Sequence, residues 1–129
     1  MKDQDFLEAL EHCTLAPDEF NHAGHVRAGY LYLRRHPFPE AAARTCTAIK
    51  AFAGSLGKPG KYHETLTIAF LALIDARLRE HGDGGGWEGF WSANASGLTR
   101  AALNAYYPAP LLDSPAAHTS LILPGPAYG

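Results

Sequence analysis

The chain has little of what marks specialised classes of protein. Its 129 residues include only two cysteines, Cys13 and Cys46. Two cysteines are too few for a disulfide framework, so we expect both thiols to be free and the protein to work in the reducing cytoplasm.

Long apolar runs and an excess of one charge are also missing. The longest apolar stretch, IAFLALI at 68–74, is far too short to span a bilayer, and the start, MKDQDFLEALEH, has no run of signal-peptide length. The formal net charge is only −2, which gives no electrostatic attraction to nucleic acid or to an anionic membrane. We expect neither as a partner.

What is present is typical of a globular protein with a core. Apolar residues make up 47% of the chain and charged residues 19%, as in ordinary soluble domains. The periodic segments have helical spacing, and no alternating run is long enough for a confident strand. The sequence therefore predicts an all-α fold, a single compact domain of five or six helices over residues 1–129. Proline and glycine separate the expected helices, which cover residues 5–12, 22–35, 39 to 54 or 57, 62–81, 87–94 and 98–107.

The tail from Pro108 onward differs from the rest. Five prolines in this segment forbid a long helix. Its leucines, however, are too apolar for a solvated tail. We expect residues 108–129 to form an irregular strap that packs back on a helical core of residues 1–107. His118 is the histidine that the strap could bring to a site on the core.

Three histidines stand at the starts of two expected helices. On a helical wheel His22 falls within the apolar stripe of its helix, and His25 lies at the edge of that stripe. His63 falls in the middle of the stripe of the 62–81 helix, which consists of Leu66, Phe70, Leu73 and Ile74. We expect His63 to point inward, and His22 and His25 to point toward the domain interior or toward the mouth of a cleft. All three should stay neutral, because a helix N-terminus disfavours a protonated imidazole.

These histidines predict a metal site. Cys13 ends the first helix, and the short connector could bring its thiol near His22. Thiolate and imidazole are soft ligands, so Cys13, His22, His25 and His63 together suit zinc, copper or iron. The spacing is not that of HExxH or of paired CxxC motifs. Taken singly, each histidine is more often a core residue bonded to a carbonyl or carboxylate.

Polar residues around His63 could take part in chemistry. Tyr62, Glu64 and Thr67, in the segment YHETLT, could supply an acid, a base or hydrogen bonds to a bound molecule. Glu64 could instead compensate the charge of the helix N-terminus, and Thr67 could bond back to the preceding turn.

Two segments carry a resemblance. CTLAPDEFNHAGHVRAGYLYLRR and KPGKYHETLT are similar to a family of small, uncharacterised all-helical bacterial proteins of about this length. The shared features are a C-T-L start, an F-x-H-x-x-H-[VL]-R segment and a Y-H-E-T-[LI]-T segment, and the similarity runs from about Cys13 to Leu78. The resemblance implies that one recurrent pattern, and hence one site, contains Cys13, His22, His25, Arg27, Tyr62, His63, Glu64 and Thr67. It implies no reaction.

The function expected from the sequence is that of a small metal-dependent enzyme. His22, His25 and His63 would be the ligands, with Cys13 as a possible fourth. An open coordination position would permit Lewis-acid or redox chemistry on a small-molecule substrate. Two alternatives stay open: metal-free acid–base catalysis by a neutral histidine with Tyr62 or Glu64, and a binding module whose histidines are structural.

Overall fold

The computed structural model describes residues 1–124. Of these residues 72% are helical and none lies in a strand, so the all-α prediction is confirmed. None of the helices in this part of the chain is both long and apolar enough to cross a membrane. Backbone contacts group the chain into two compact units, Met1–Tyr62 and a second that begins at His63. The expectation of a single domain stays a prediction.

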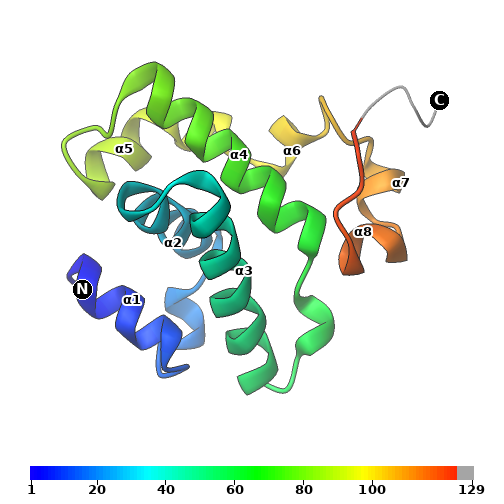
Figure 1. Ribbon diagram of the computed structural model, residues 1–129, viewed down its shortest axis with the longest axis horizontal. Helices are drawn as coiled ribbons and strands as arrows, with labels where there is room; N and C mark the ends of the chain where they lie inside the picture. Colours follow the sequence, from blue (N-terminus) through cyan, green and yellow to red (C-terminus); the bar gives the residue numbers. More distant parts are fainter. Residues whose placement is uncertain (125–129) are drawn as a thin grey trace. The chain divides into compact units, whose positions relative to one another are not determined.

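The first unit consists of three helices (Figure 1). They are α1 (Asp3–Glu11), α2 (His22–Arg35) and α3 (Phe38–Ser55), and single 3-10 turns lie at Pro17–Glu19 and Pro59–Lys61. α3 packs against both α2 and α1. The buried side chains come from all three helices and from the loop before α2, and they include Phe6, Leu7, Leu10, Leu15, Phe20, Val26, Tyr30, Leu31, Ile49 and Phe52.

The start of α2 is fixed by Asn21 and Gly24. Asn21 is the N-cap of α2, and its side chain accepts a hydrogen bond of 2.9 Å from the Gly24 N–H. This bond satisfies one of the donors that a helix N-terminus leaves unpaired. A Cβ at Gly24 would lie 2.5 Å from the backbone oxygen of Glu19. Only glycine therefore lets the 3-10 turn approach the helix so closely.

The second unit is built around α4 (Glu64–His81). It continues through α5 (Trp87–Asn94), a 3-10 turn at Ala95–Gly97, α6 (Arg100–Leu103), α7 (Ala109–Leu112) and α8 (Pro115–Thr119). α5 has the predicted bounds, and Gly82 ends α4 at a φ of 79°, a left-handed conformation that suits glycine at a helix end. α6 is shorter than the predicted helix over 98–107.

The predicted core stripe of α4 is partly wrong. Thr65, Leu71 and Ile74 form its buried face, whereas Phe70 and Leu73 are only half-buried. α4 is apolar on most sides, so periodicity could not single out one face.

The tail is more regular than predicted. α7 begins directly after Pro108, and α8 has Pro115 in its first turn, where a proline removes no helical hydrogen bond. These short helices bring the number of α-helices in residues 1–124 to eight, more than the five or six expected.

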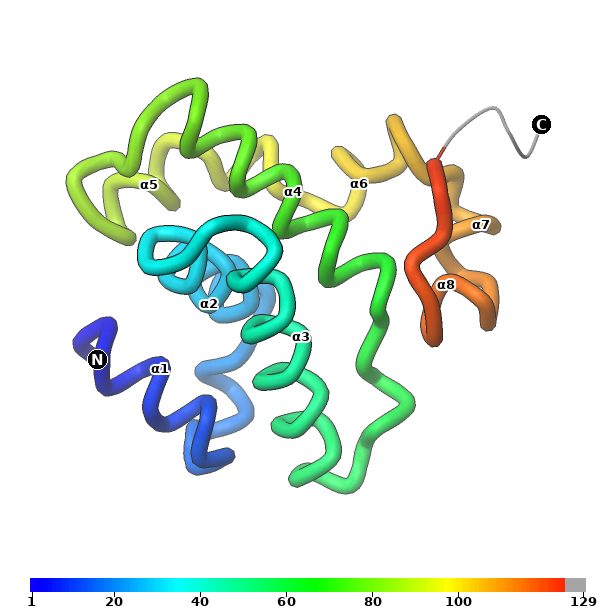
Figure 2. Tube along the Cα trace, viewed as in Figure 1, coloured from blue at the N-terminus to red at the C-terminus, as the bar shows by residue number. Residues whose placement is uncertain are grey.

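After α8 the chain is not helical, and it returns to its own unit. In Figure 2 the trace turns back after α8. The Thr65 hydroxyl of α4 donates to the Ser120 oxygen (2.6 Å) and accepts from the Ile122 N–H (3.2 Å). The Tyr107 hydroxyl donates to the Ile122 oxygen at 2.9 Å. These hydrogen bonds hold the described end of the strap to Thr65 and Tyr107. Residues 125–129, the rest of the predicted strap, lie outside the described residues.

The close approach at Gly24 yields a first prediction. Gly24→Ala should destabilise the protein by about 1–3 kcal/mol, because the new methyl group meets backbone oxygen that cannot turn aside. Gly54→Ala is the matched control in α3, since nothing lies within 4 Å of its Cβ position. There, alanine should stabilise by about 0.5–1 kcal/mol. Urea denaturation measures both, and equal effects of the two substitutions would contradict the packing described for α2.

Candidate functional site

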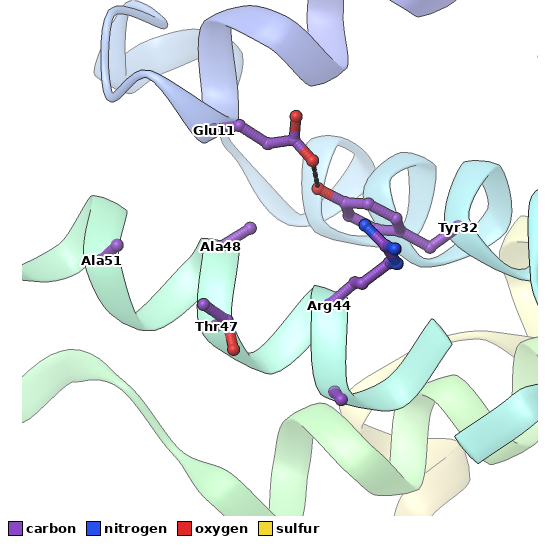
Figure 3. A pocket seen from close by; sticks show the side chains of 7 residues that line it. Glu11, Tyr32, Arg44, Thr47, Ala48 and Ala51 are labelled. Atoms are coloured by element: carbon purple, nitrogen blue, oxygen red, sulfur yellow. Dashed lines mark hydrogen bonds between the residues drawn. The ribbon is translucent and has the colours of Figure 1, made fainter. Parts of the chain in front are cut away.

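The first unit has an open hollow along α3, which we call the α3 groove (Figure 3). Its volume is about 310 Å³, within the range of about 300–1,000 Å³ usual for small-molecule sites. Small side chains of α3 form one wall, and polar groups arrive from all three helices. The lining residues are Glu11, Tyr32, Ala43, Arg44, Thr47, Ala48 and Ala51.

A short hydrogen bond joins α1 and α2 in the groove. The Tyr32 hydroxyl donates to Glu11 Oε2 at 2.6 Å, the dashed line in Figure 3. Burial raises the pKa of Tyr32, and the hydrogen bond and negative charge of Glu11 raise it further. Arg44 and Arg35 act in the opposite direction. Tyr32 is therefore a firmly protonated donor that cannot serve as a base near neutral pH.

Arg44 supplies positive charge to the groove. Its Nε and one terminal nitrogen donate to Glu40 Oε1, one helical turn earlier, at 3.3 and 3.0 Å. This hydrogen bond holds the pKa of Glu40 below its usual range. A guanidinium has five N–H donors, so the pair with Glu40 leaves Arg44 able to bind an anionic group as well.

His22 and His25 share the first turn of α2, and both are exposed. Of the two positions predicted for them, the one in the domain interior is therefore wrong. A helical wheel gives only the angle of a side chain around the helix axis, and not its depth in the protein. His25 Nδ1 lies 2.9 Å from the Asn21 oxygen, so Nδ1 carries the proton and Nε2 the lone pair.

One face of the His25 ring is nevertheless shielded from water. It stacks on Phe20 with ring centroids 3.9 Å apart. This desolvation lowers the pKa of His25, the bond to Asn21 raises it, and the charge of nearby His22 lowers it. Neutral His25 is favoured, as expected from the sequence.

Cys13 follows α1 and is half-buried. Its φ of 57° lies in the left-handed region, which costs a non-glycine residue about 1–2 kcal/mol. Neither Cys13 nor Cys46 forms a disulfide, as expected.

His63 is buried and is the N-cap of α4. Its Nδ1 accepts the Leu66 N–H at 3.0 Å, and its Nε2 donates to the Leu112 oxygen at 2.7 Å. The inward orientation predicted for His63 is therefore confirmed. The same two bonds occupy both ring nitrogens, so His63 could ligate a metal only if one of them broke.

The three residues predicted to assist catalysis lie beside His63 in the sequence. Tyr62 is buried at the end of the first unit, and the Lys50 ammonium lies 5.9 Å from the centre of its ring. Glu64 is the first residue of α4. The Thr67 hydroxyl donates to the His63 oxygen at 2.7 Å, which is the local back-bond considered as its alternative role.

The structure brings together only parts of the predicted metal set. His22 and His25 are neighbours in the first unit, whereas His63 begins the second. Within residues 1–124, no three side chains among histidine, cysteine, aspartate and glutamate are grouped as metal ligands. The four-residue metal site stays a prediction.

Sequence reasoning missed the groove. No spacing rule joins Tyr32 to Glu11, which lies 21 residues earlier in the chain. A tyrosine at a stripe edge, between apolar and polar faces, was the available signal. His118 was the histidine that the strap could bring to a site on the core. Its ring lies beside that of His63, with the two ring centroids 4.1 Å apart.

Comparisons of the chain with protein-family models, with curated proteins and with solved structures found no match. The resemblance to small bacterial proteins therefore stays an expectation, and the function is argued from the geometry.

The environment of Tyr32 yields a second prediction. Subtracting the phenolate absorbance titration of Tyr32→Phe from that of the parent should isolate Tyr32, with a midpoint well above 10.0, the ordinary value. Because the folded pKa is raised, the associated stability is complete below pH 10 and is lost as the pH rises through the folded pKa.

Glu11→Gln is the informative companion to this measurement. Burial is the largest cause of the shift, so the midpoint of Tyr32 should fall in Glu11→Gln but stay above the ordinary value. Far-ultraviolet circular dichroism at each pH verifies that the helices persist. A Tyr32 that titrates at its ordinary value in the folded parent would show that the groove is open to water at this hydroxyl.

Proposed function

We propose that this protein is a binding module that holds a free amino acid, or a similar small molecule with an amine and a carboxylate, in the α3 groove. The observation that carries the proposal is the Glu11–Tyr32 hydrogen bond of 2.6 Å in a groove that Arg44 also lines. The histidines at the helix starts are then structural.

The polar groups define the chemistry of the ligand. The one O–H of Tyr32 is already used in the hydrogen bond to Glu11, so the Tyr32 oxygen, like the carboxylate, can only accept further hydrogen bonds. A protonated amine satisfies both acceptors. Arg44 is near enough for its charge to act on the pKa of Tyr32, and its guanidinium suits a carboxylate. A small molecule that carries both an amine and a carboxylate can therefore satisfy the two acceptors and the cation of the groove together.

The remaining wall accommodates the body of the ligand. Figure 3 shows the methyl groups of Ala48 and Ala51 on the side of α3 that faces Glu11 and Tyr32, and Thr47 also lines the groove. These short side chains leave the hollow open. They offer apolar contacts to a ligand but no pocket shaped for a bulky ligand side chain. The groove therefore suits a small ligand with a short, largely apolar side chain.

The third prediction tests binding and its ligand class. Titration with free small amino acids should shift the amide resonances of α3 around Thr47 in a saturable way. N-acetylated or esterified forms should bind at least about tenfold more weakly, since each loses a charge-assisted hydrogen bond worth about 1.5–3 kcal/mol. Equal shifts with all three forms, or no saturable shift with any, would sink the proposal.

Matched variants separate the groove from general charge effects. Arg44→Gln should weaken binding about tenfold. Arg79→Gln is the matched control, because Arg79 pairs with Asp75 four residues earlier in α4, as Arg44 pairs with Glu40 in α3. Arg79 does not line the groove, so this substitution should leave binding unchanged. Ala51→Leu should block the groove, whereas Ala72→Leu, at an exposed position of α4, should not. Binding that survives Ala51→Leu would place the ligand elsewhere.

A metal-dependent enzyme is the second candidate, and one observation favours it. The Nδ1–H of His25 is anchored on a backbone oxygen at 2.9 Å. Proteins commonly orient metal-binding histidines through such a bond, which presents Nε2 to the ion. His22 lies three residues earlier on the same turn, and His63 and Cys13 complete the set predicted from the sequence, with zinc, copper or iron as the metal.

The fourth prediction tests this second candidate. Calorimetric titration of untagged protein with zinc or copper should show binding of one ion, and His22→Ala and His25→Ala should each weaken it without additive effect. His63→Ala should do the same only if His63 is a ligand. His12→Ala, which removes an exposed histidine of no predicted role, is the control. Unchanged affinity in His25→Ala would end the metal hypothesis.

A further inference from the structure

We propose that Arg27 of α2 is a positioning residue for the α3 groove: it holds the start of α1 so that Glu11, at the end of the same helix, meets Tyr32. All the contacts involved lie within the first unit. The effect on a ligand rests on the proposed function, whereas the effect on the Glu11–Tyr32 hydrogen bond does not.

Arg27 contacts the start of α1 in two ways. One terminal nitrogen of its guanidinium donates to the Met1 oxygen at 2.7 Å and to Asp3 Oδ1 at 2.8 Å. The guanidinium carbon also lies 4.6 Å from the centre of the Phe6 ring, a distance that suits a cation–π contact. The side chain of Arg27 is only 16% exposed, which strengthens these contacts relative to the same contacts in water.

The bonds from Arg27 add direction to a helix that is otherwise held by apolar packing. The buried side chains of α1 are Phe6, Leu7 and Leu10. Hydrophobic contacts are non-directional, whereas a hydrogen bond weakens steeply when its angle or length changes. The two hydrogen bonds therefore define the position and rotation of the first turn of α1 more sharply than the apolar contacts do.

A defined start also defines the far end of α1, because this helix is short and continuous. It has nine residues, from Asp3 to Glu11, so its ends lie about 12 Å apart. At the far end the Tyr32 hydroxyl donates to Glu11 Oε2 at 2.6 Å. Polar contacts thus tie both ends of α1 to α2, and they hold the acceptors that the groove offers to an amine in one arrangement.

The remaining nitrogen of the Arg27 side chain agrees with this role. Nε is buried and has no hydrogen-bond partner among residues 1–124. A buried donor without a partner lowers stability, so an apolar side chain would suit this position better if packing alone mattered. An apolar side chain, however, could not make the two directed bonds to Met1 and Asp3.

The hydroxyl proton of Tyr32 gives a direct readout of the positioning. Tyr32 is 2% exposed and its bond to the carboxylate is short and strong, so this proton should give a downfield resonance that is absent from Tyr32→Phe. Arg27→Met keeps the length of the side chain but lacks its donors, and the resonance should move upfield as Glu11 draws back. The charges that act on the pKa of Tyr32 are those of Glu11, Arg44 and Arg35. A shift in Arg27→Met therefore reports the movement of Glu11 and not the loss of the Arg27 charge.

Three variants separate positioning from a general loss of stability. In Glu11→Gln the carboxylate is already gone, so adding Arg27→Met should leave the Tyr32 resonance where Glu11→Gln puts it. Arg27→Lys can still donate to the start of α1, so its resonance should lie between those of Arg27→Met and the parent. Gly24→Ala, whose new methyl group meets Glu19 and not α1, should leave the resonance unchanged.

Asp3→Ala tests the same contact from the side of α1. The Asp3 side chain is 46% exposed, so its loss spares the core. The Tyr32 resonance should again move upfield, but by less than in Arg27→Met, because the bond from Arg27 to Met1 remains. This variant decides the question should Arg27→Met fail to fold.

Ligand binding gives the second readout. Arg27→Met should weaken the binding of a free amino acid to the parent groove roughly threefold to tenfold, whereas Arg79→Met in α4 should not change it. A parent that binds no free amino acid ends the proposed function, and the hydroxyl resonance then decides the role of Arg27 alone. A Tyr32 resonance that stays at the parent position in Arg27→Met and Asp3→Ala would overturn the positioning role. So would a shift of the same size when Arg27→Met is added to Glu11→Gln.

Discussion

The second unit depends on one neutral imidazole. His63 accepts from Leu66 with one ring nitrogen and donates to Leu112 with the other, so it joins the start of α4 to the end of α7, 49 residues later. A buried polar side chain lowers stability unless its donors and acceptors are paired. Here both are paired, and the pairing fixes the tautomer. The same buried group thus sets the helix start and the position of the tail.

The groove of the first unit follows a related rule. A tyrosine hydroxyl removed from water needs a partner, and Glu11 supplies one at 2.6 Å. The bond commits the only proton of Tyr32 and leaves acceptors facing the hollow. The short side chains of α3 expose these acceptors rather than cover them. A polar pair that could have been closed by larger residues is left open, as a binding site requires.

Features that depend on contacts within a few residues could be predicted from the sequence, whereas features that depend on contacts between distant residues could not. Asn21 and Gly82 mark helix ends because their contacts lie within a few residues, so both could be found from the sequence. The exposure of His22 and His25 could not be predicted, because hydrophobic periodicity gives the direction of a side chain around the helix axis and not its depth in the protein. The partner of Tyr32 and the Leu112 bond of His63 join residues far apart in the chain. No spacing rule encodes such pairs.

The histidines at the two helix starts have opposite tautomers. His25 donates from Nδ1 to Asn21, whereas His63 accepts at Nδ1 from Leu66. Each proton position is fixed by whether the backbone partner is a carbonyl or an N–H. A positive charge is unfavourable at a helix N-terminus, and burial or stacking adds to that penalty for both rings. Neutrality, which suggested metal ligation from the sequence, is thus explained in each case by the local backbone. His63 needs its lone pair for the cap, and only His25 keeps an Nε2 lone pair for another partner.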